Sequence, residues 1–290
     1  MGEDPTLESF RRLVLARGAE LYRDLPWRRT RDPYQVWISE VMLQQTQVTR
    51  VDGRWQRWVE LFPTPDALAA ADSADVLEEW QGMGYNRRAL SLWKAAGMVS
   101  ARGGQMPRAY ADLLALPGIG PATAAGIRAF SHNLPGVYLE TNVRSVFIHE
   151  LYPDAVDVTD RELLPLVERS CPMDDSDPND DPRTWYYALL DYGAYLKRTL
   201  PNPSRRSASH VRQSKFEGSH RQKRAEVVRI LLAHRTDTRG GASAAAIADE
   251  LGEREERRGR TCLSVADVES ILEELAKEGF CRLRDGIWLA

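Results

Sequence analysis

Apolar residues recur at spacings of three and four positions along most of the chain, which is the period of amphipathic α-helices. Proline and glycine interrupt this period at short intervals, so that the apolar segments divide into at least eight helices. The apolar and polar alternation typical of strands is nearly absent before residue 280. The pattern therefore predicts an all-α body. The helical period is clearest in residues 6–22, 34–51, 74–83 and 88–101.

The pattern changes after residue 221. Amphipathic segments at 224–235, 243–252 and 264–280 predict three helices, and strand-like residues flank Asp285-Gly286, a dipeptide favoured in tight hairpins. This order predicts a winged-helix-like domain over residues 221–290. Such a domain binds DNA or makes only protein contacts, and the sequence leaves both functions open.

The composition is that of an ordinary globular protein, with 43% apolar and 28% charged residues among 290. No segment approaches the ~18–20 apolar residues of a membrane span, and the first twelve residues are too polar for a signal peptide. We therefore expect a cytoplasmic protein without membrane contact. The three cysteines, Cys171, Cys262 and Cys281, lie too far apart in sequence to suggest a metal or iron–sulfur motif.

Charge is distributed unevenly, although the formal net charge is only −3. Residues 173–182 contain five aspartates and two prolines, which predicts a solvated loop. Residues 203–224 carry seven Arg or Lys against one Glu, a local balance of +6. This stretch is either a soluble linker or a segment that follows the phosphate backbone of a nucleic acid. The candidate phosphate-binding residues are Arg205, Arg206, Arg212 and Lys215.

Residues 113–130, LLALPGIGPATAAGIRAF, predict a helix end, a glycine hairpin and a second helix. Pro121 suits the first turn of that helix because this position needs no backbone N–H. The glycines leave N–H groups uncovered at a helix N-terminus, where the helix dipole favours an anion. The hairpin can therefore hold a phosphate without a lysine, although similar hairpins also occur as plain structure.

The order of five segments resembles the helix-hairpin-helix (HhH-GPD) DNA glycosylase superfamily and, within it, the adenine glycosylase (MutY) branch. The resemblance covers residues 20–200 and is most specific in the first two segments. It implies a two-lobed helix-hairpin-helix glycosylase core over residues 1–202, with a six-helix lobe at 26–134 and a second lobe from 1–25 and 135–202. Residues 203–220 would be a basic linker. The segments are LPWRRTRDPYQVWISEVMLQQTQVTRV, WQGMGYNRRALSLWKAA, LLALPGIGPATAAGIRAF, YLETNVRSVF and ALLDYGAYLKR.

Breaking an N-glycosidic bond requires protonation of the leaving base and stabilisation of the cationic sugar. The resemblance assigns the acid to Glu40, whose apolar neighbours would raise its pKa. The family places an aspartate where this chain has Glu140, so the second carboxylate carries one additional methylene. Either the pocket accommodates Glu140 or the activity is altered. Asn142 follows in register with the family asparagine.

Ala122 occupies the position of the lysine nucleophile in bifunctional members of the superfamily. Its substitution implies a monofunctional enzyme that uses water and leaves an abasic site. In the family register, Gln45 and Tyr85 fill the gap left by the extruded base and insert beside the opposite base. The aromatic residues are also compatible with core positions. The implied base pocket is formed by Leu25, Trp27, Arg28, Asn142 and Asp191, and the implied hairpin contacts to DNA by Pro117, Gly118, Ile119, Gly120, Ala122 and Thr123.

The chain departs from the family in two places. The cysteines of the usual iron–sulfur cluster are missing after ALLDYGAYLKR, so we expect no cofactor. The C-terminal segment does not resemble the domain that senses 8-oxoguanine in adenine glycosylases. The expected partner is double-stranded DNA with a mispaired or damaged base, bound by a nucleoid-associated monomer. Removal of mispaired adenine is the leading interpretation. A glycosylase for another base and a catalytically silent DNA-binding protein are the alternatives.

Overall fold

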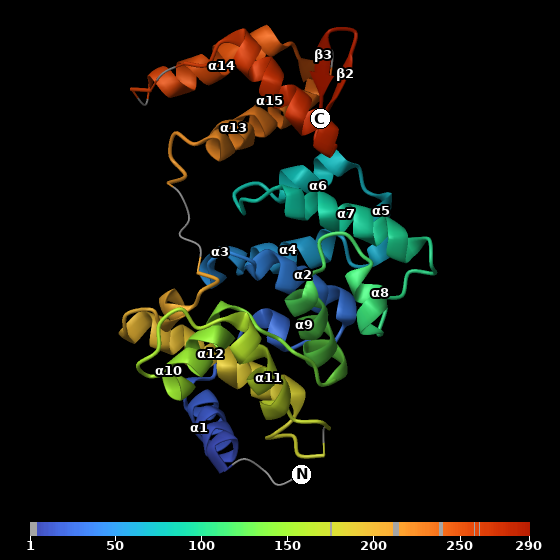
Figure 1. Cartoon of the computed structure of the whole chain (residues 1–290). Coiled ribbons are helices and arrows are strands. Elements are labelled where there is room, and N and C mark those ends of the chain that lie inside the picture. Colours follow the sequence, from blue (N-terminus) through green and yellow to red (C-terminus); the bar gives the residue numbers. More distant parts are fainter. Residues whose placement is uncertain (1–4, 175, 211–214, 238–239, 258, 261) are drawn as a thin grey trace. The chain divides into compact units, whose positions relative to one another are not determined.

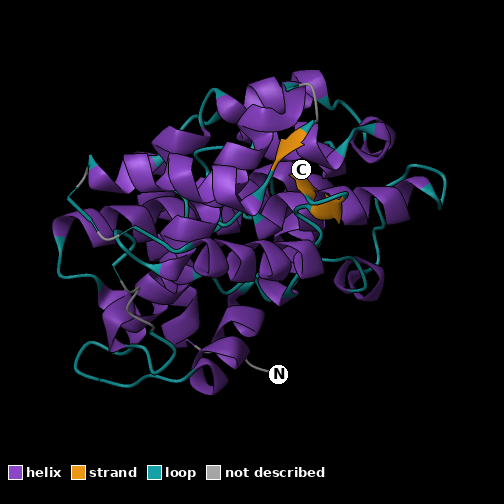
Figure 2. Cartoon of the chain, turned by 90° about the horizontal axis from the view of Figure 1, so that it is seen from above, coloured by secondary structure: helices purple, strands orange, loops and turns teal. Residues whose placement is uncertain are grey.

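The computed structural model describes residues 5–174, 176–210, 215–237, 240–257, 259–260 and 262–290. Helices make up most of this part of the chain, and the strands lie in its C-terminal portion (Figure 2). The predicted all-α body is thus confirmed. The chain divides into two compact units, which are described separately. The first contains Met1–Val59 and Gln105–Arg212, and the second contains Glu60–Gly104 and Gln213–Ala290.

The described part of the first unit is built from α-helices (Figure 1) and two 3₁₀ turns. The helix α4 crosses the division, since its last two residues belong to the second unit. The elements are α1 (Pro5–Leu21), η1 (Pro26–Arg28), α2 (Pro33–Leu43), α3 (Val48–Val51), α4 (Arg54–Leu61), α8 (Tyr110–Leu114), α9 (Pro121–His132), α10 (Thr141–Leu151), α11 (Asp160–Ser170), α12 (Pro182–Thr199) and η2 (Pro203–Arg206).

Helix α12 is central to the core of the first unit because it packs against α1, α9 and α10. Trp185 and Tyr186 on this helix are fully buried, and Phe10 of α1 meets the Trp185 ring edge-on at 6.0 Å. A side chain at Gly193 would collide with the backbone of Asn142, whose carbonyl carbon would lie 2.6 Å from the added Cβ. Glycine at this position therefore lets α12 approach the start of α10.

Local sequence signals mark where these helices begin. Asp32 and Asp181 each accept a backbone N–H in the first turn of the helix that follows, and a proline occupies the first helical position in both. Thr159 and Glu162 form a capping box at the start of α11. The acidic stretch at 173–182 is mostly exposed as predicted, but Asp181 is buried because it caps α12.

The second unit contains α5–α7 together with the C-terminal helices and a small sheet. The three predicted C-terminal helices and the hairpin at Asp285-Gly286 are confirmed, and both turn residues have positive φ. The sequence did not predict β1, which pairs with β3 to give the strand order β1-β3-β2. The elements are α5 (Pro65–Ala70), α6 (Ser73–Glu79), α7 (Arg87–Ser100), α13 (His220–Ala233), η3 (His234–Thr236), β1 (Gly241–Ala242), α14 (Ala244–Glu256), α15 (Val265–Glu278), β2 (Arg282–Arg284) and β3 (Ile287–Leu289).

The start of the predicted basic linker is ordered structure. Residues 203–206 form η2, and Ser207 makes a parallel bridge with Val158. The Arg206 guanidinium donates to four backbone carbonyls near the end of α10, among them Tyr152 at 2.6 Å and Ile148 at 3.2 Å. The Arg206 side chain thus has an intramolecular role, and its predicted phosphate contact stays a prediction. The predicted lobe and domain boundaries stay predictions, because the compact units group the residues differently.

Candidate active site

The Glu40 carboxyl occupies a niche in the first unit that Gly126 leaves open. Glu40 lies on α2, and Gly126 lies on α9, which packs against α2. A Cβ at Gly126 would collide with Glu40 Oε2 and would lie 2.8 Å from Cε2 of Tyr138. The carboxyl therefore fills the space that a side chain on α9 would take. The Tyr138 ring forms another wall of this niche.

Burial raises the pKa of Glu40 to about 8. A hydrogen bond with the Tyr138 hydroxyl and the positive charge of Arg28 lower this pKa, whereas the negative charge of Glu140 raises it further. Burial also raises the pKa of Tyr138 well above its usual value, so the phenol is protonated at neutral pH. Glu40 is thus mostly a neutral acid near pH 7, as its apolar neighbours predict.

The Glu140 carboxylate caps the N-terminus of α10. Its Oε1 accepts the backbone N–H of Asn142 at 2.5 Å and that of Val143 at 2.9 Å, and its Oε2 accepts the Asn142 side-chain amide at 3.2 Å. Burial raises the pKa of Glu140, while these donors and the charge of Lys197 lower it. The longer side chain is therefore accommodated as a helix cap, where donors favour its ionised form.

The Asp191 carboxylate on α12 forms ion pairs with two arginines. Its carboxylate accepts both terminal nitrogens of Arg28, at 2.7 and 2.8 Å, and Nε of Arg23 at 2.5 Å. The Arg28 guanidinium also lies 4.3 Å from the ring centre of Tyr187. A buried charge cluster with this many donors holds its members rigidly. Arg28 and Asp191, both predicted pocket residues, are therefore brought together.

The remaining predicted pocket residues differ in exposure. Trp27 is only 4% exposed and meets Trp55 edge-on at 6.3 Å, which fits the core position that its residue type also allowed. Leu25 is half-buried at the start of η1. Asn142 is half-buried and donates to Glu140.

The predicted glycine hairpin is present between α8 and α9. Gly118 has φ +80°, a left-handed conformation that favours glycine, and α9 begins after Gly120 without a side-chain cap. Pro117 is half-buried, and Ile119 is buried. These features suit backbone contacts to an anion.

Two predicted side chains at the start of α9 point to the interior of the first unit. Ala122 is half-buried against the apolar core. Thr123 is buried, and its hydroxyl accepts the Gln44 amide at 3.1 Å. The Thr123 side chain thus connects α9 to the end of α2, and the predicted DNA contact of Thr123 stays a prediction.

The two predicted insertion residues are exposed and share an unusual backbone conformation. Gln45 belongs to the first unit and has φ +53°, and Tyr85 belongs to the second unit and has φ +51°. Residues other than glycine rarely adopt this left-handed backbone conformation. Backbone strain of this kind concentrates at functional sites. The Tyr85 loop is fixed from beneath, because Trp80 Nε1 and Arg88 Nη2 each donate to the Gly84 carbonyl at 3.0 Å.

The other predicted DNA-binding residues are only partly described. Arg205 is exposed and lines a cavity of about 340 Å³ together with His149. Lys215 is exposed as well. Arg212 lies outside the described residues.

Three residues that shape the site are not predicted by the sequence. Gly126 was detectable in principle, since a glycine inside a helix costs about 1 kcal/mol relative to alanine and so points to a packing reason. Tyr138 reaches Glu40 from a connecting segment, and no local pattern marks it. Lys197 lies one helical turn after Gly193, on the face of α12 that meets α10. Its charge acts on Glu140.

Two absences apply to the described part of the chain. It contains no group of three or more His, Cys, Asp or Glu side chains that could hold a metal ion. None of its helices combines the length and the apolar composition needed to cross a membrane.

Comparison with curated proteins finds adenine DNA glycosylases. The chain is 38% identical over 174 residues to that of Mycolicibacterium smegmatis, which is 59% of this chain and 58% of that protein. It is 41% identical over 127 residues to that of Mycobacterium tuberculosis (43% and 42%) and 38% over 148 residues to that of Homo sapiens (48% and 27%). The chain thus spans between 27% and 58% of the length of these relatives.

Comparison with solved structures concerns the fold. The structure of a thermostable thymine-DNA glycosylase has a TM-score of 0.59 and 22% identity, covering 76% of this chain and 94% of that one. A non-covalent endonuclease III–DNA complex gives 0.52 and 18%, covering 73% and 92%. The predicted glycosylase fold is confirmed. The profile described as "HhH-GPD superfamily base excision DNA repair protein" matches residues 38–179. Residues 38–179, which contain the glycine hairpin and the half-buried Glu40, therefore match the HhH-GPD superfamily.

Proposed function

We propose that this protein is a monofunctional DNA N-glycosylase that removes mispaired adenine from duplex DNA and leaves an abasic site. The observation that carries this proposal is the unequal environment of two carboxyls in the first unit. Burial raises the pKa of both carboxyls, to about 8 for Glu40, whereas Glu140 also accepts two backbone N–H groups that favour its anion. Pairs of titratable groups with such different environments are typical of acid–base catalysis.

In the first step, the neutral Glu40 carboxyl donates its proton to a ring nitrogen of the extruded adenine. The bond between the base nitrogen and C1′ of the sugar then breaks, and its electrons leave with the base. The sugar acquires a positive charge, which the Glu140 carboxylate stabilises. Water adds to C1′ and gives a proton to the Glu40 carboxylate. The products are free adenine and an abasic site, and Glu40 is again an acid.

The chain's own residues keep this arrangement in register. The niche at Gly126 leaves the Glu40 carboxyl little freedom, because α9 and the Tyr138 ring enclose it. The cap on α10 likewise fixes the carboxylate of Glu140. Such preorganisation lowers the reorganisation needed at the moment of reaction.

The monofunctional part of the proposal is supported by Ala122, which has no amine to attack the sugar. Strand cleavage by the superfamily's lysine route needs a Schiff base between such an amine and C1′. Treatment with borohydride during the reaction should therefore trap no protein–DNA adduct. Strand breaks should appear only after alkali. A trapped adduct would contradict the monofunctional proposal.

We propose further that the protein works without an iron–sulfur cluster. A cluster of this kind takes four cysteine thiolates, and the chain has three cysteines, of which Cys171 and Cys281 are buried in different units. The residues present therefore do not fit the group. The purified protein should show no visible absorbance band of an iron–sulfur centre, and such a band would contradict this.

The decisive experiment is a panel of duplexes incubated with the purified chain and then treated with alkali. The panel contains A opposite 8-oxoguanine, A opposite G, and T or U opposite G. Cleavage of the adenine duplexes by the parent protein, and its loss in Glu40→Gln, is the expected result. Cleavage of only the T or U duplexes would assign the site to another base. If no duplex is cut and Glu40→Gln binds DNA as well as the parent, the enzymatic proposal is wrong.

A further inference from the structure

The C-terminal helices are joined to α7 of the second unit by a charged cluster. Glu278 at the end of α15 accepts Arg87 of α7 at 2.7 Å and Arg224 of α13 at 2.8 Å. Arg224 also binds Glu274 at 2.7 Å. The Lys94 ammonium, from α7 as well, donates to the Glu278 carbonyl at 3.2 Å.

A second cluster lies at the other end of α13. Arg235 of η3 forms ion pairs with Asp75 and, at 3.7 Å, with Asp72, which caps α6. Two separate groups of ion pairs thus join the C-terminal helices to α6 and α7. These helices and the loop between α6 and α7, which carries Tyr85, therefore form one compact body.

This docking brings α13 to the Tyr85 loop. Arg221 Nη1 donates to the Tyr85 hydroxyl at 3.4 Å, and the Arg88 guanidinium lies 5.4 Å from the centre of the Tyr85 ring. Burial lowers the pKa of Arg88 to about 10, which leaves it charged at neutral pH. An exposed aromatic ring in a strained loop is thus flanked by two cations. Rings and guanidinium groups in this combination are typical of surfaces that stack nucleobases and bind phosphates.

The start of α13 has an unfavourable charge for a helix N-terminus. Its first five residues are HRQKR, and the first turn contains no acidic residue. Cations at this end oppose the helix dipole, which favours anions there. His220 and Arg224 are compensated by Glu274. The charge of Lys223 lowers the pKa of Asp267 on α15. A phosphate beside this turn would be favoured by the helix dipole and by the basic side chains together.

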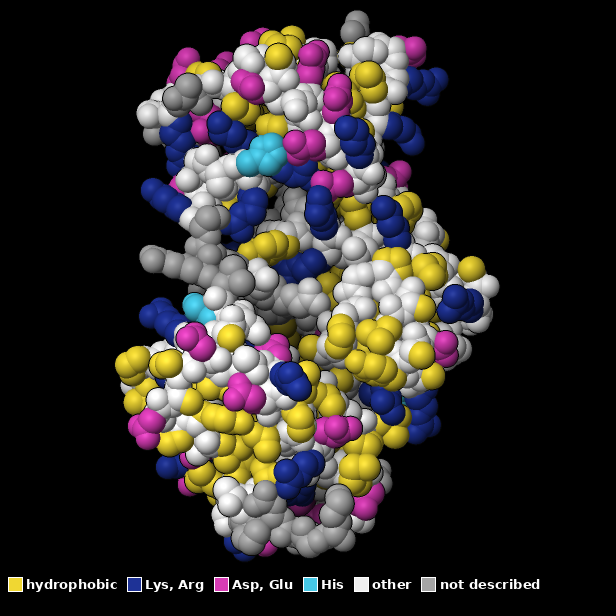
Figure 3. All heavy atoms as spheres, viewed as in Figure 1, with side chains coloured by type: hydrophobic (Ala, Val, Ile, Leu, Met, Phe, Trp, Pro, Cys, Tyr) yellow, Lys and Arg dark blue, Asp and Glu magenta, His cyan; other side chains and the backbone are white. Residues whose placement is uncertain are grey.

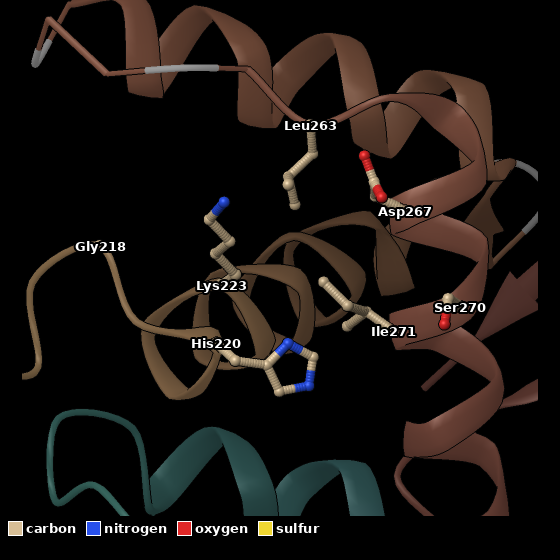
Figure 4. A pocket seen from close by; sticks show the side chains of 7 residues that line it. All are labelled: Gly218, His220, Lys223, Leu263, Asp267, Ser270 and Ile271. Atoms are coloured by element: carbon tan, nitrogen blue, oxygen red, sulfur yellow. The ribbon is translucent and has the colours of Figure 1, made fainter. Parts of the chain in front are cut away.

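A cavity of about 240 Å³ lies beside this turn, between α13 and α15. His220 and Lys223 line it from α13, and Asp267 and Ile271 line it from α15 (Figure 4). On the face drawn in Figure 3, basic and acidic side chains are interspersed over the C-terminal helices. The excess of basic residues at the start of α13 is therefore local. A small group of basic side chains of this kind would contact only a few phosphates of a nucleic-acid backbone.

We infer that the first turn of α13 is a DNA-binding surface, on which Arg221 and Lys223 contact phosphates of the strand next to the base step that Tyr85 enters. This inference rests on the proposed function, because it takes duplex DNA as the partner. It selects DNA over a protein for the C-terminal domain. An exposed ring flanked by cations suits a nucleic-acid strand, in which bases that can stack lie next to phosphates.

The test compares Arg221→Gln and Lys223→Gln with the matched control Arg229→Gln. Arg229 lies on the same helix and binds Glu226 at 2.9 Å, away from the first turn. The binding of full-length protein to a fluorescent duplex with a stable analogue of the abasic site is measured by anisotropy between 50 and 200 mM salt. Removing one phosphate-binding cation should reduce the slope of log K against log salt by about 0.9. The control should keep the parent slope.

We expect Arg221→Gln and Lys223→Gln each to weaken binding several-fold at 100 mM salt, with circular dichroism spectra like that of the parent. The inference is wrong if both variants keep the affinity and the salt slope of the Arg229→Gln control.

Single-turnover base release at saturating protein separates this inference from the proposed function. Unchanged rates with weakened binding support the inference. Base release by the parent, combined with unchanged binding by both variants, contradicts the inference alone. Weakened binding by the variants in a parent that releases no base supports the DNA surface and contradicts the proposed catalysis.

Discussion

The niche of Glu40 and the cap of Glu140 treat the same functional group differently: burial raises the pKa of both carboxyls, but donors at the helix start partly lower that of Glu140. The Glu40 carboxyl lies against α9 at Gly126 and next to the Tyr138 ring, and its pKa rises to about 8. Glu140 lies at a helix start, where backbone N–H groups point at its oxygens. The comparison teaches that neighbouring backbone decides the role of a carboxyl more than its residue type does. The longer side chain of a glutamate still reaches the backbone N–H groups at the start of α10.

The largest expected effect comes from removing the acid. Glu40→Gln keeps the shape of the side chain but cannot donate the proton. The single-turnover rate of base release should therefore fall by a factor of ~10²–10⁴. DNA affinity should remain close to that of the parent. The matched comparison is Glu20→Gln, an exposed glutamate that pairs with Arg17 of α1, which should keep the parent rate. Equal rates for both variants would show that Glu40 is not the acid.

Removal of the negative charge at Glu140 should have the next largest effect. Glu140→Gln keeps an oxygen for the helix N–H groups but loses the negative charge, so the rate should fall by roughly 10²–10³, the range seen when one electrostatic stabiliser is removed. Glu140→Asp restores the charge at a shorter reach and should recover part of the rate. If Glu140→Asp and Glu140→Gln are equally slow, reach and not charge limits this position.

A substitution on α9 tests the niche itself. In Gly126→Ala the new Cβ collides with the Glu40 carboxyl, so we expect a loss of about 1–3 kcal/mol in the free energy of unfolding, together with a slower reaction. The matched control is Gly97→Ala on α7, where an added Cβ meets no atom within 4 Å. Urea unfolding of both variants measures the difference. Equal midpoints would contradict the close contact.

The raised pKa of Glu40 also predicts how stability changes with pH. A carboxyl whose pKa rises from 4.5 to about 8 on folding favours the folded state below pH 4.5, and this contribution is lost as the pH rises towards 8. Glu40→Gln has no such dependence. The variant should therefore gain stability over the parent across this window, by on the order of a few kcal/mol. If the difference in the free energy of unfolding between variant and parent stays constant from pH 4.5 to 8, folding does not raise the pKa of Glu40.

The smallest effects are shifts of the pH–rate profile. The Tyr138 hydroxyl lowers the pKa of Glu40, so Tyr138→Phe should move the alkaline limb to higher pH. Lys197 lowers the pKa of Glu140, so Lys197→Met should move the acidic limb to higher pH. Glu140 raises the pKa of Glu40, and two cations also act on this pair. Arg28 lowers the pKa of Glu40, and Lys197 lowers that of Glu140. Arg23 in turn acts on Lys197. Unmoved limbs in both variants would assign these residues to packing alone.

Much of the fold could be predicted from the sequence because its signals are local. The helical period, the prolines at helix starts and the Asp285-Gly286 turn depend on neighbouring residues, and each of these was found. Strand β1 was missed because Gly241 and Ala242 carry no strand pattern, and β3 supplies their pairing. The contacts of Arg206 with the carbonyls at the end of α10 were missed, since its charge suggested phosphates alone.

The site was predicted through its motif residues and not through the residues that support them. Glu40, Glu140, Arg28 and Asp191 stand in recognisable segments. The contact of Gly126 with Glu40 spans 86 positions of the sequence, and composition does not reveal such a contact. The roles of these residues in catalysis stay predictions, as do the absence of a cluster, the monomeric state and the cytoplasmic location.

The space at Gly126 has a consequence for reading other sequences. Because the carboxyl of Glu40 fills the volume next to the glycine Cα, replacing that glycine would have to displace the acid. Glycine at this helix position can therefore serve as a marker when genomes are surveyed. A chain that keeps the acid but carries a bulky residue on the facing helix would be ranked as a degenerate copy before any assay, and a chain that keeps both would be selected for testing.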